Sequence, residues 1–270
     1  MSGWSAVHGI VVRDLTRSTR QTSRLVGGIA RPFMWLLLVG TGFNAITRLE
    51  SGIPYHAYVF PGIVMMAALF GGALTAVSTV YDREFGMLRL MLASPAGIPA
   101  VLAGRALAAT LVGMLQGGIV LAVAPLVLVL APSRWPGAVA ALAAVTAMSA
   151  LFGLLIAARL RSVENFAGII NVVLFPLLFL SGALYPTAGL PPALLLLARA
   201  NPVTYAVDLL RHALGQPAER AMSVDLIVVI GSTVLAFLVT ALLFDPEQRL
   251  AGGGGRGTTP AAVPHRGSRP

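Results

Sequence analysis

The residue types that carry most catalytic chemistry are missing from this chain. It contains no lysine, and a phosphate-binding P-loop needs a lysine to reach the nucleotide phosphates, so a normal P-loop is excluded. It contains no cysteine, which excludes disulfides, thiolate metal sites and cysteine nucleophiles. We therefore expect a chain that does not hydrolyse ATP by itself.

The remaining candidates for catalysis or metal binding lack partners at a useful spacing. The histidines are scattered, with no pair at the spacing of a zinc-binding helix; they are His8, His56, His212 and His265. Ser181 lies in the sequence LSGAL, which is not the GxSxG turn of a serine hydrolase. The sequence therefore predicts that the chain is not an enzyme and holds no metal ion.

The composition is that of a protein surrounded by lipid. Hydrophobic residues make up 57% of the chain and charged residues only 11%, whereas roughly a quarter of the residues of a soluble domain are charged. The net charge of +9 comes entirely from arginine, and the arginines flank apolar segments. We interpret this charge as the positive-inside bias of a membrane protein rather than as a surface for nucleic acid.

Six apolar segments approach the roughly 20 helical residues that are needed to cross a hydrocarbon core about 30 Å thick. A central arginine costs about 2.5–3.5 kcal/mol, so we end each segment where charged residues begin. Arg105, Arg159 and Arg161 then lie just outside their segments, and no charged residue lies inside one. The predicted spans are residues 32–46, 57–80, 106–130, 136–158, 166–184 and 226–244.

This topology divides the chain into three parts. Residues 1–31 form a basic helix on the cytoplasmic membrane surface (or, alternatively, a disordered arm), residues 32–244 form the six-span domain, and residues 245–270 form a disordered cytoplasmic tail. Fourteen arginines lie on the side of the N-terminus and five on the other, which predicts that both termini are cytoplasmic. The basic helix carries Arg13, Arg17, Arg20, Arg24 and Arg31.

Two connections between the spans contain helical segments of their own. Residues 81–95, YDREFGMLRLMLASP, favour a short helix at the cytoplasmic surface, with Glu84 near its positive end. Residues 190–199 and 202–214 are apolar but too short to cross, and they predict a helical hairpin that plugs the outward side of the bundle. Asp208 and Arg211 are expected to pair on one face of this hairpin or to cap it.

Few polar residues lie inside the predicted spans. Gln116 and Asn171 are expected to bond between helices or to line a pathway, and the glycines at 71, 72, 113 and 117 to let helices pack closely. The absence of charge in the spans argues against an ion-coupled carrier. Candidate residues of a pathway or outer gate are Gln116, Asn171, Ser181, Tyr185, Asn201 and Pro202.

Five motifs follow one another over most of residues 30–211. They are ARPFMWLLLVGTGF (30–43), YVFPGIVMM (58–66), DREFGMLRLMLASP (82–95), FPLLFLSGALYP (175–186) and NPVTYAVDLLR (201–211). Their order over six spans resembles that of the ABC type-2 exporter permeases, in particular the daunorubicin-resistance-like branch. The sequence departs from the family where Met87 and Arg89 replace a usual threonine and second acid.

The resemblance implies that two permease chains pair, with a homodimer expected, and that each binds one cytoplasmic ATPase subunit. ATP and Mg²⁺ would bind to that ATPase, and no cofactor to this chain. The basic N-terminal helix would be the family's elbow helix, and the hairpin would form part of an outer gate. The coupling helix, which docks on the ATPase, would comprise Arg83, Glu84, Phe85, Gly86, Met87, Leu88, Arg89 and Leu90.

The function expected is therefore that of a multi-pass exporter permease in a bacterial plasma membrane. It would move a hydrophobic or amphiphilic compound, such as a drug or secondary metabolite, out of the cytoplasm or inner leaflet. A lipid or lipid-linked glycan is an alternative cargo, and a non-transporting membrane scaffold or sensor is an alternative function.

Overall fold

The chain folds as a bundle of helices. The computed structural model describes residues 3–46, 52–92, 97–160 and 162–253, leaving out the side chains of residues 22–25, 45–46, 89, 92 and 245–253. All regular structure in the described residues is helical, which confirms the predicted all-α membrane class. The elements are α1 (Gly3–Arg20), α2 (Thr22–Trp35), η1 (Leu36–Thr41), α3 (Gly42–Ile46), α4 (Tyr55–Thr75), α5 (Val77–Glu84), α6 (Met87–Leu92), α7 (Gly97–Leu121), α8 (Ala124–Val127), η2 (Pro132–Arg134), α9 (Trp135–Arg159), α10 (Val163–Phe179), η3 (Thr187–Gly189), α11 (Pro192–Ala200), α12 (Pro202–Leu214) and α13 (Met222–Gly253).

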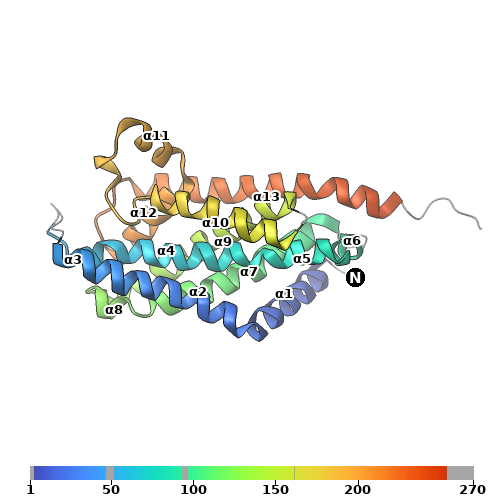
Figure 1. Cartoon of the computed structure of the whole chain (residues 1–270), viewed down its shortest axis with the longest axis horizontal. Coiled ribbons are helices and arrows are strands. Elements are labelled where there is room, and N and C mark those ends of the chain that lie inside the picture. Colours follow the sequence, from blue (N-terminus) through green and yellow to red (C-terminus); the bar gives the residue numbers. More distant parts are fainter. Residues whose placement is uncertain (1–2, 47–51, 93–96, 161, 254–270) are drawn as a thin grey trace, which may run out of the picture.

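The two ends of the elongated bundle carry different elements (Figure 1). The short helix α6 and the start of α1 lie at one end, which we call the α6 end. The pair α11 and α12 lies at the other, which we call the α11 end. The long helices run between these ends, so the predicted short helix and the predicted hairpin lie on opposite sides of the molecule.

Five segments are long and apolar enough to cross a membrane, and the bent pair α11–α12 makes a sixth if it is counted as one span. The two helices of that pair, which correspond to the predicted hairpin, are bent by 76° at their break. The five segments are Val26–Asn44, Tyr55–Glu84, Gly97–Val127, Pro132–Arg159 and Met222–Phe244.

The predicted fifth span is shorter than expected. Helix α10 has 17 residues and ends at Phe179 rather than at residue 184. At about 1.5 Å per residue it rises about 25 Å, which is less than a hydrocarbon core of about 30 Å. The helix stops because the chain turns through Gly182, whose φ of 77° is one that side-chain-bearing residues rarely adopt.

The other helices extend beyond their predicted ends into charged sequence. Helix α7 begins at Gly97, nine residues before the predicted span, and therefore includes Arg105. Helix α5 continues to Glu84 and includes Asp82, while α13 begins at Met222 and includes Asp225. The predicted segments themselves contain no charged residue, but the helices are longer, and they bury Asp82, Arg105 and Asp225 near the bundle ends.

The helices at the two ends of the predicted six-span domain continue past its boundaries. The break between the basic helix and the first span is at Gln21, and α2 runs through residue 31 without interruption. Helix α1 runs obliquely from the α6 end to meet α2 (Figure 1), and it packs on α7 with Ile10 and Val11 buried. Helix α13 continues to Gly253, so the first part of the predicted tail is helical, and residues 254–270 lie outside the described part of the chain.

Helix α4 is the centre of the bundle, and nearly all of its residues are buried. Glycines bring its neighbours close: a Cβ added at Gly72 would lie 3.0 Å from the backbone nitrogen of Ala150 in α9. A Cβ added at Gly113 of α7 would lie 3.0 Å from the nitrogen of Gly72 itself. The expectation that these glycines allow close helix packing is confirmed.

We predict that Gly153→Ala destabilises the bundle. A Cβ at Gly153 in α9 would lie 2.5 Å from the Cα and carbonyl oxygen of Ala73, and overpacking of this kind costs about 1–3 kcal/mol. The expected result is a lower melting temperature of the detergent-solubilised chain. The matched control is Gly231→Ala in α13, where nothing lies within 4 Å of the added Cβ. Equal melting temperatures for the two variants would contradict this packing.

Candidate functional site

A buried carboxylate at the α6 end binds three arginines. Asp82 of α5 is 6% exposed, and its Oδ2 lies 2.5 Å from Nη2 of Arg105, which is itself 2% exposed. The same oxygen lies 2.7 Å from Nη2 of Arg13, and Oδ1 lies 3.4 Å from Nη1 of Arg17. Because Arg13 and Arg17 belong to α1 and Arg105 to α7, Asp82 joins three separate helices.

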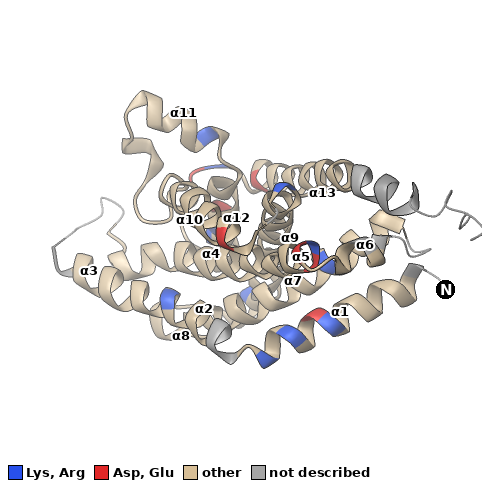
Figure 2. Ribbon diagram, turned by 45° about the vertical axis from the view of Figure 1, so that its right-hand side comes forward, with Lys and Arg blue, Asp and Glu red and all other residues tan. Residues whose placement is uncertain are grey.

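A second carboxylate and a thioether complete this cluster. Arg13 also pairs with Asp14, Nη2 to Oδ1, at 2.8 Å. Burial by itself lowers the pKa of Arg13, but the carboxylates of Asp14 and Asp82 raise it overall, so the guanidinium stays charged. Nη2 of Arg105 lies 3.3 Å from Sδ of Met91, so α6 is attached to the same group. We call Arg13, Asp14, Arg17, Asp82 and Arg105 the inner ion cluster. Figure 2 shows charged positions in blue and red along α1 and on α5.

The charged residues of the predicted coupling helix contact this chain itself. Arg83 donates to the carbonyl oxygens of Ala157 and of Leu160, the latter at 2.7 Å, at the C-terminal end of α9. Glu84 accepts from the backbone nitrogen of Val163, at 3.4 Å, where α10 begins. Arg83 brings a positive charge to the C-terminal end of α9, which is negative, and Glu84 brings a negative charge to the N-terminal end of α10, which is positive. Each charge therefore stabilises the helix end that it contacts. These interactions hold the α9–α10 turn, and the contact of Arg83 and Glu84 with a soluble partner stays a prediction.

The apolar residues of the same segment divide into two groups. Leu88 is 1% exposed and packs with Ile10, Ile98, Val101 and Phe244, so it is not an outward anchor. Phe85, Met87 and Leu90 are 72%, 47% and 68% exposed. They surround the turn at Gly86, which has a φ of 76°. The side chain of Arg89 is outside the described residues. We call the three exposed side chains the α6 apolar patch.

The arginines predicted to lie on a membrane-surface helix have different surroundings. Arg13 and Arg17 point inward to Asp82, and Arg20 is exposed. The side chain of Arg24 is outside the described residues. Arg31 lies within the candidate span Val26–Asn44 rather than on the surface helix, and its Cζ lies 4.6 Å from the centre of the Phe70 ring.

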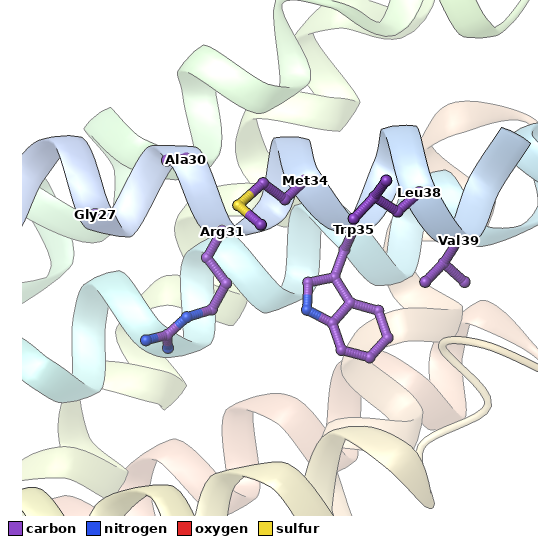
Figure 3. Close-up of a pocket in the computed structure, with 7 residues that line it drawn as sticks. All are labelled: Gly27, Ala30, Arg31, Met34, Trp35, Leu38 and Val39. Atoms are coloured by element: carbon purple, nitrogen blue, oxygen red, sulfur yellow. The ribbon is translucent and has the colours of Figure 1, made fainter. Parts of the chain in front are cut away.

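A groove follows the exposed side of α2 (Figure 3). In this view Arg31 and Trp35 project to the same side of the helix with open space between them. The part of the groove lined by Leu38 and Val39 belongs to η1, which is a π-helical stretch. Turns of π-helix are frequent at functional sites. The groove has a volume of about 520 Å³, and it is lined by Gly27, Ala30, Arg31, Met34, Trp35, Leu38 and Val39.

Ionic interactions at the α11 end fix the hairpin. Asp208 accepts from the backbone nitrogens of Glu219, at 2.9 Å, and Arg220, at 2.8 Å. Arg211 donates to the carbonyl oxygen of Gly182 at 2.7 Å, and it stacks over Tyr58. Asp208 and Arg211 lie 3.8 Å apart, which confirms their expected pairing.

One grouping at this end has side chains of the types that bind metals. Among the described residues, Asp208, His212 and Asp225 place one ligand atom each within 4.8 Å of one another. His212 Nε2 lies 3.4 Å from Asp225 Oδ2. Guanidinium nitrogens of Arg211 and Arg220 lie 3.8 and 4.0 Å from Asp208, and this positive charge disfavours a further cation. The scattered histidines of the sequence do not predict this contact.

The predicted gate residues do not form one site. Asn201 caps α12 and donates to the carbonyl oxygen of Leu177, at 2.6 Å, directly before Pro202. Ser181 is buried and bonds to its own turn, whereas Tyr185 is 36% exposed. Asn171 donates to the carbonyl oxygen of Ala167 in its own helix. Gln116 is buried beside Gly28 and Gly71, and its Oε1 has no hydrogen-bond partner among the described residues.

Comparison with known proteins relates this arrangement to transport proteins. A family model described as ABC-2 type transporter matches residues 6–214, from α1 to the end of α12. Transport permease ycf38 of Porphyra purpurea is 29% identical over 212 residues, which are 76% of this chain and 72% of the relative. Nodulation protein J of Rhizobium leguminosarum bv. viciae is 29% identical over 231 residues, 81% of this chain and 86% of the relative.

The inner ion cluster leads to a prediction for Asp82→Asn and Arg105→Met. Either single substitution leaves a buried charge with less compensation, which costs about 3–5 kcal/mol. The double variant removes both charges, so we expect it to be clearly more stable than the sum of the single effects allows. Melting of the three variants in detergent checks this, with exposed Glu164→Gln as control. Strictly additive effects would show that the pair is not coupled.

Proposed function

The chain belongs to the ABC-2 type transporter family, and we propose that it is the membrane subunit of an exporter driven by a separate ATPase. As a transport permease of this family it is a multi-pass membrane protein, and the family implies an ATP-binding partner. The chain has no lysine for a P-loop, so in this proposal ATP and Mg²⁺ bind only to the partner.

The α6 apolar patch is the observation that carries this proposal. Three large apolar side chains are exposed together on a turn at the end of the bundle, where a membrane protein meets water. Clustered exposed apolar residues of this kind mark a protein interface. The hydrogen bonds of Arg83 and Glu84 hold the turn at Gly86 against α9 and α10. A docked ATPase would therefore push on a rigid element. We therefore place the coupling contact at Phe85, Met87 and Leu90.

The inner ion cluster supports a route from this contact to the spans. Met91 of α6 contacts both Arg105 of α7 and Arg13 of α1 through its sulfur. A displacement of α6 would therefore act on α1 and α7 together. Because α1 leads directly into α2, the movement would reach the groove.

The α2 groove supports transport of a hydrophobic or amphiphilic compound. It is apolar apart from Arg31, and it lies on a helix that is largely exposed, where a lipid-soluble compound can reach it from the side. A second candidate cargo is a lipid or a lipid-linked glycan, which the lateral opening favours equally. In this proposal the α6 end faces the cytoplasm of a bacterial cell, both termini are cytoplasmic, and α11–α12 closes the outward end.

The assembled complex would contain two permease chains and two ATPase subunits. The outward face of α13 is exposed along much of its length, which leaves apolar surface for a second copy of this chain. A non-transporting scaffold would share this assembly but would move no substrate.

Co-expression with an ABC ATPase subunit from the same organism tests the proposal. We expect the two proteins to co-purify, and vesicles that contain both to move a lipophilic dye only when ATP is supplied. ATP hydrolysis without dye movement would favour the scaffold. Dye movement that continues without ATP but stops with a protonophore would indicate an ion-coupled carrier instead.

For the coupling contact we predict that Phe85→Ala combined with Leu90→Ala lowers ATPase binding at least tenfold. Each truncation removes an apolar side chain worth about 1.5–3 kcal/mol when it is fully buried at an interface. The melting temperature should not change, because both side chains are exposed. The control is Leu196→Ala with Leu197→Ala on α11, at the opposite end. Unchanged ATPase binding by the first variant, or equal loss in both, would remove the docking contact from α6.

A further inference from the structure

Arg31 differs from the other buried and half-buried arginines of the described residues in lacking a polar partner. Arg13, Arg17 and Arg105 pair with Asp82, and Arg211 pairs with Asp208. Arg31 has only the face of the Phe70 ring, 4.6 Å from its Cζ. A half-buried charge within a membrane span is costly unless a counter-charge is supplied, and such residues usually mark functional sites. The partner of Arg31 is therefore expected to come from outside the described chain.

The space around Arg31 is divided into a small inner cavity and the long groove. The inner cavity, of about 230 Å³, lies between α2 and α4 beside Phe70, and Arg31 also lines the groove. Neither Gly27 nor Gly28 has a side chain that could fill this region. Beyond Arg31 the groove is apolar, with Met34, Trp35 and Leu38 along it (Figure 3).

We propose that Arg31 and the α2 groove bind a lipid with an anionic phosphate head, taken from the leaflet at the α6 end. The phosphate would lie on the guanidinium of Arg31, whose planar fork suits phosphate oxygens. One acyl chain would lie along the groove over Trp35 and Leu38. This inference rests on the proposed transport function, and it assigns the class of amphiphile that the groove accepts.

The positions along α2 place the charge nearer one end of the span and the apolar part of the groove deeper. Arg31 lies five residues beyond the start of the candidate span at Val26, or about 8 Å at 1.5 Å per residue. In a hydrocarbon core about 30 Å thick this is about half the depth of one leaflet, so the long arginine side chain has to reach toward the head groups. Val39 lies eight residues further, about 12 Å deeper, so the groove continues past the bilayer centre. A lipid of that leaflet has the same direction, with its charge outside and its chain inside.

The residues also distinguish a lipid from a free phosphate. A phosphate ion would use Arg31 alone and would gain nothing from the apolar walls. A lipid with a zwitterionic head would fill the groove but would bring a cation close to Arg31. The anionic lipid satisfies both the unpaired charge and the apolar surface, so it is the occupant that the side chains favour.

Binding of fluorescent phosphatidylglycerol to the purified full-length chain in a neutral detergent tests the proposal. We expect phosphatidylglycerol to bind at least tenfold more tightly than phosphatidylcholine carrying the same chains. Soluble glycerol phosphate should not compete, because it lacks the chain. Equal affinity for the two lipids would overturn the role of Arg31, and displacement by glycerol phosphate would overturn the role of the groove.

Three variants separate charge from shape. Arg31→Gln should remove the preference for phosphatidylglycerol, and Arg31→Lys should retain part of it. Leu38→Trp, which narrows the groove without touching the charge, should weaken both lipids. Arg20→Gln, at an exposed arginine of α1, should change neither affinity. Unchanged phosphatidylglycerol affinity in both Arg31→Gln and Leu38→Trp would reject the site.

The two proposals can fail separately, because this binding assay contains no ATPase. Loss of lipid preference leaves ATPase co-purification and ATP-dependent dye movement to be judged by themselves. Conversely, a chain that binds phosphatidylglycerol through Arg31 but never binds an ATPase would retain the lipid site and lose the exporter function.

Discussion

The buried carboxylate of Asp82 holds the α6 end together. A single acid among three arginines joins the N-terminal helix to two of the central helices, and the thioether of Met91 adds α6. In a low-dielectric region such charges are stable only while they are paired, so the helices that carry them cannot separate without a large cost. The proposed coupling contact, the entry of α1 into α2 and the start of α7 all depend on this interaction.

The rest of the bundle is held by different means at different levels. In the middle, glycines allow α4 to lie directly against α7 and α9, so that packing rather than charge sets the distances. At the α11 end, Asp208 and Arg211 again bind backbone groups of neighbouring segments. Broad apolar faces of α2 and α13 stay uncovered. A movement that keeps the ion pairs at both ends and the glycine contacts in the middle would therefore displace whole helices.

The sequence predicted the helical class, the spans near 57–80 and 136–158, the short helix and the hairpin, because long apolar runs and proline breaks are local signals. It failed where pairing between distant residues decides the outcome. The rule that charges end a span placed Arg105 outside, since nothing local shows that Asp82 would neutralise it. It also assigned Leu88 to a partner surface, although the fold buries Leu88 in a core. The sequence did not predict the groove, because the groove requires Arg31 to lie inside α2 and not at the boundary between two helices.

The enclosure of α4 has a consequence for biogenesis. This helix is synthesised before α7 and α9, which later cover it, so it must first exist in the membrane with lipid on every side. Its sequence suits that stage: residues 55–81 contain no charged side chain, and the mean hydropathy of the segment Tyr55–Glu84 is 2.0. Asp82, in the following helix α5, can pair with Arg13 and Arg17, which are synthesised before it, and it gains Arg105 only when α7 follows. Insertion of α7 therefore covers the glycine faces of α4 and adds the buried arginine that completes the inner ion cluster.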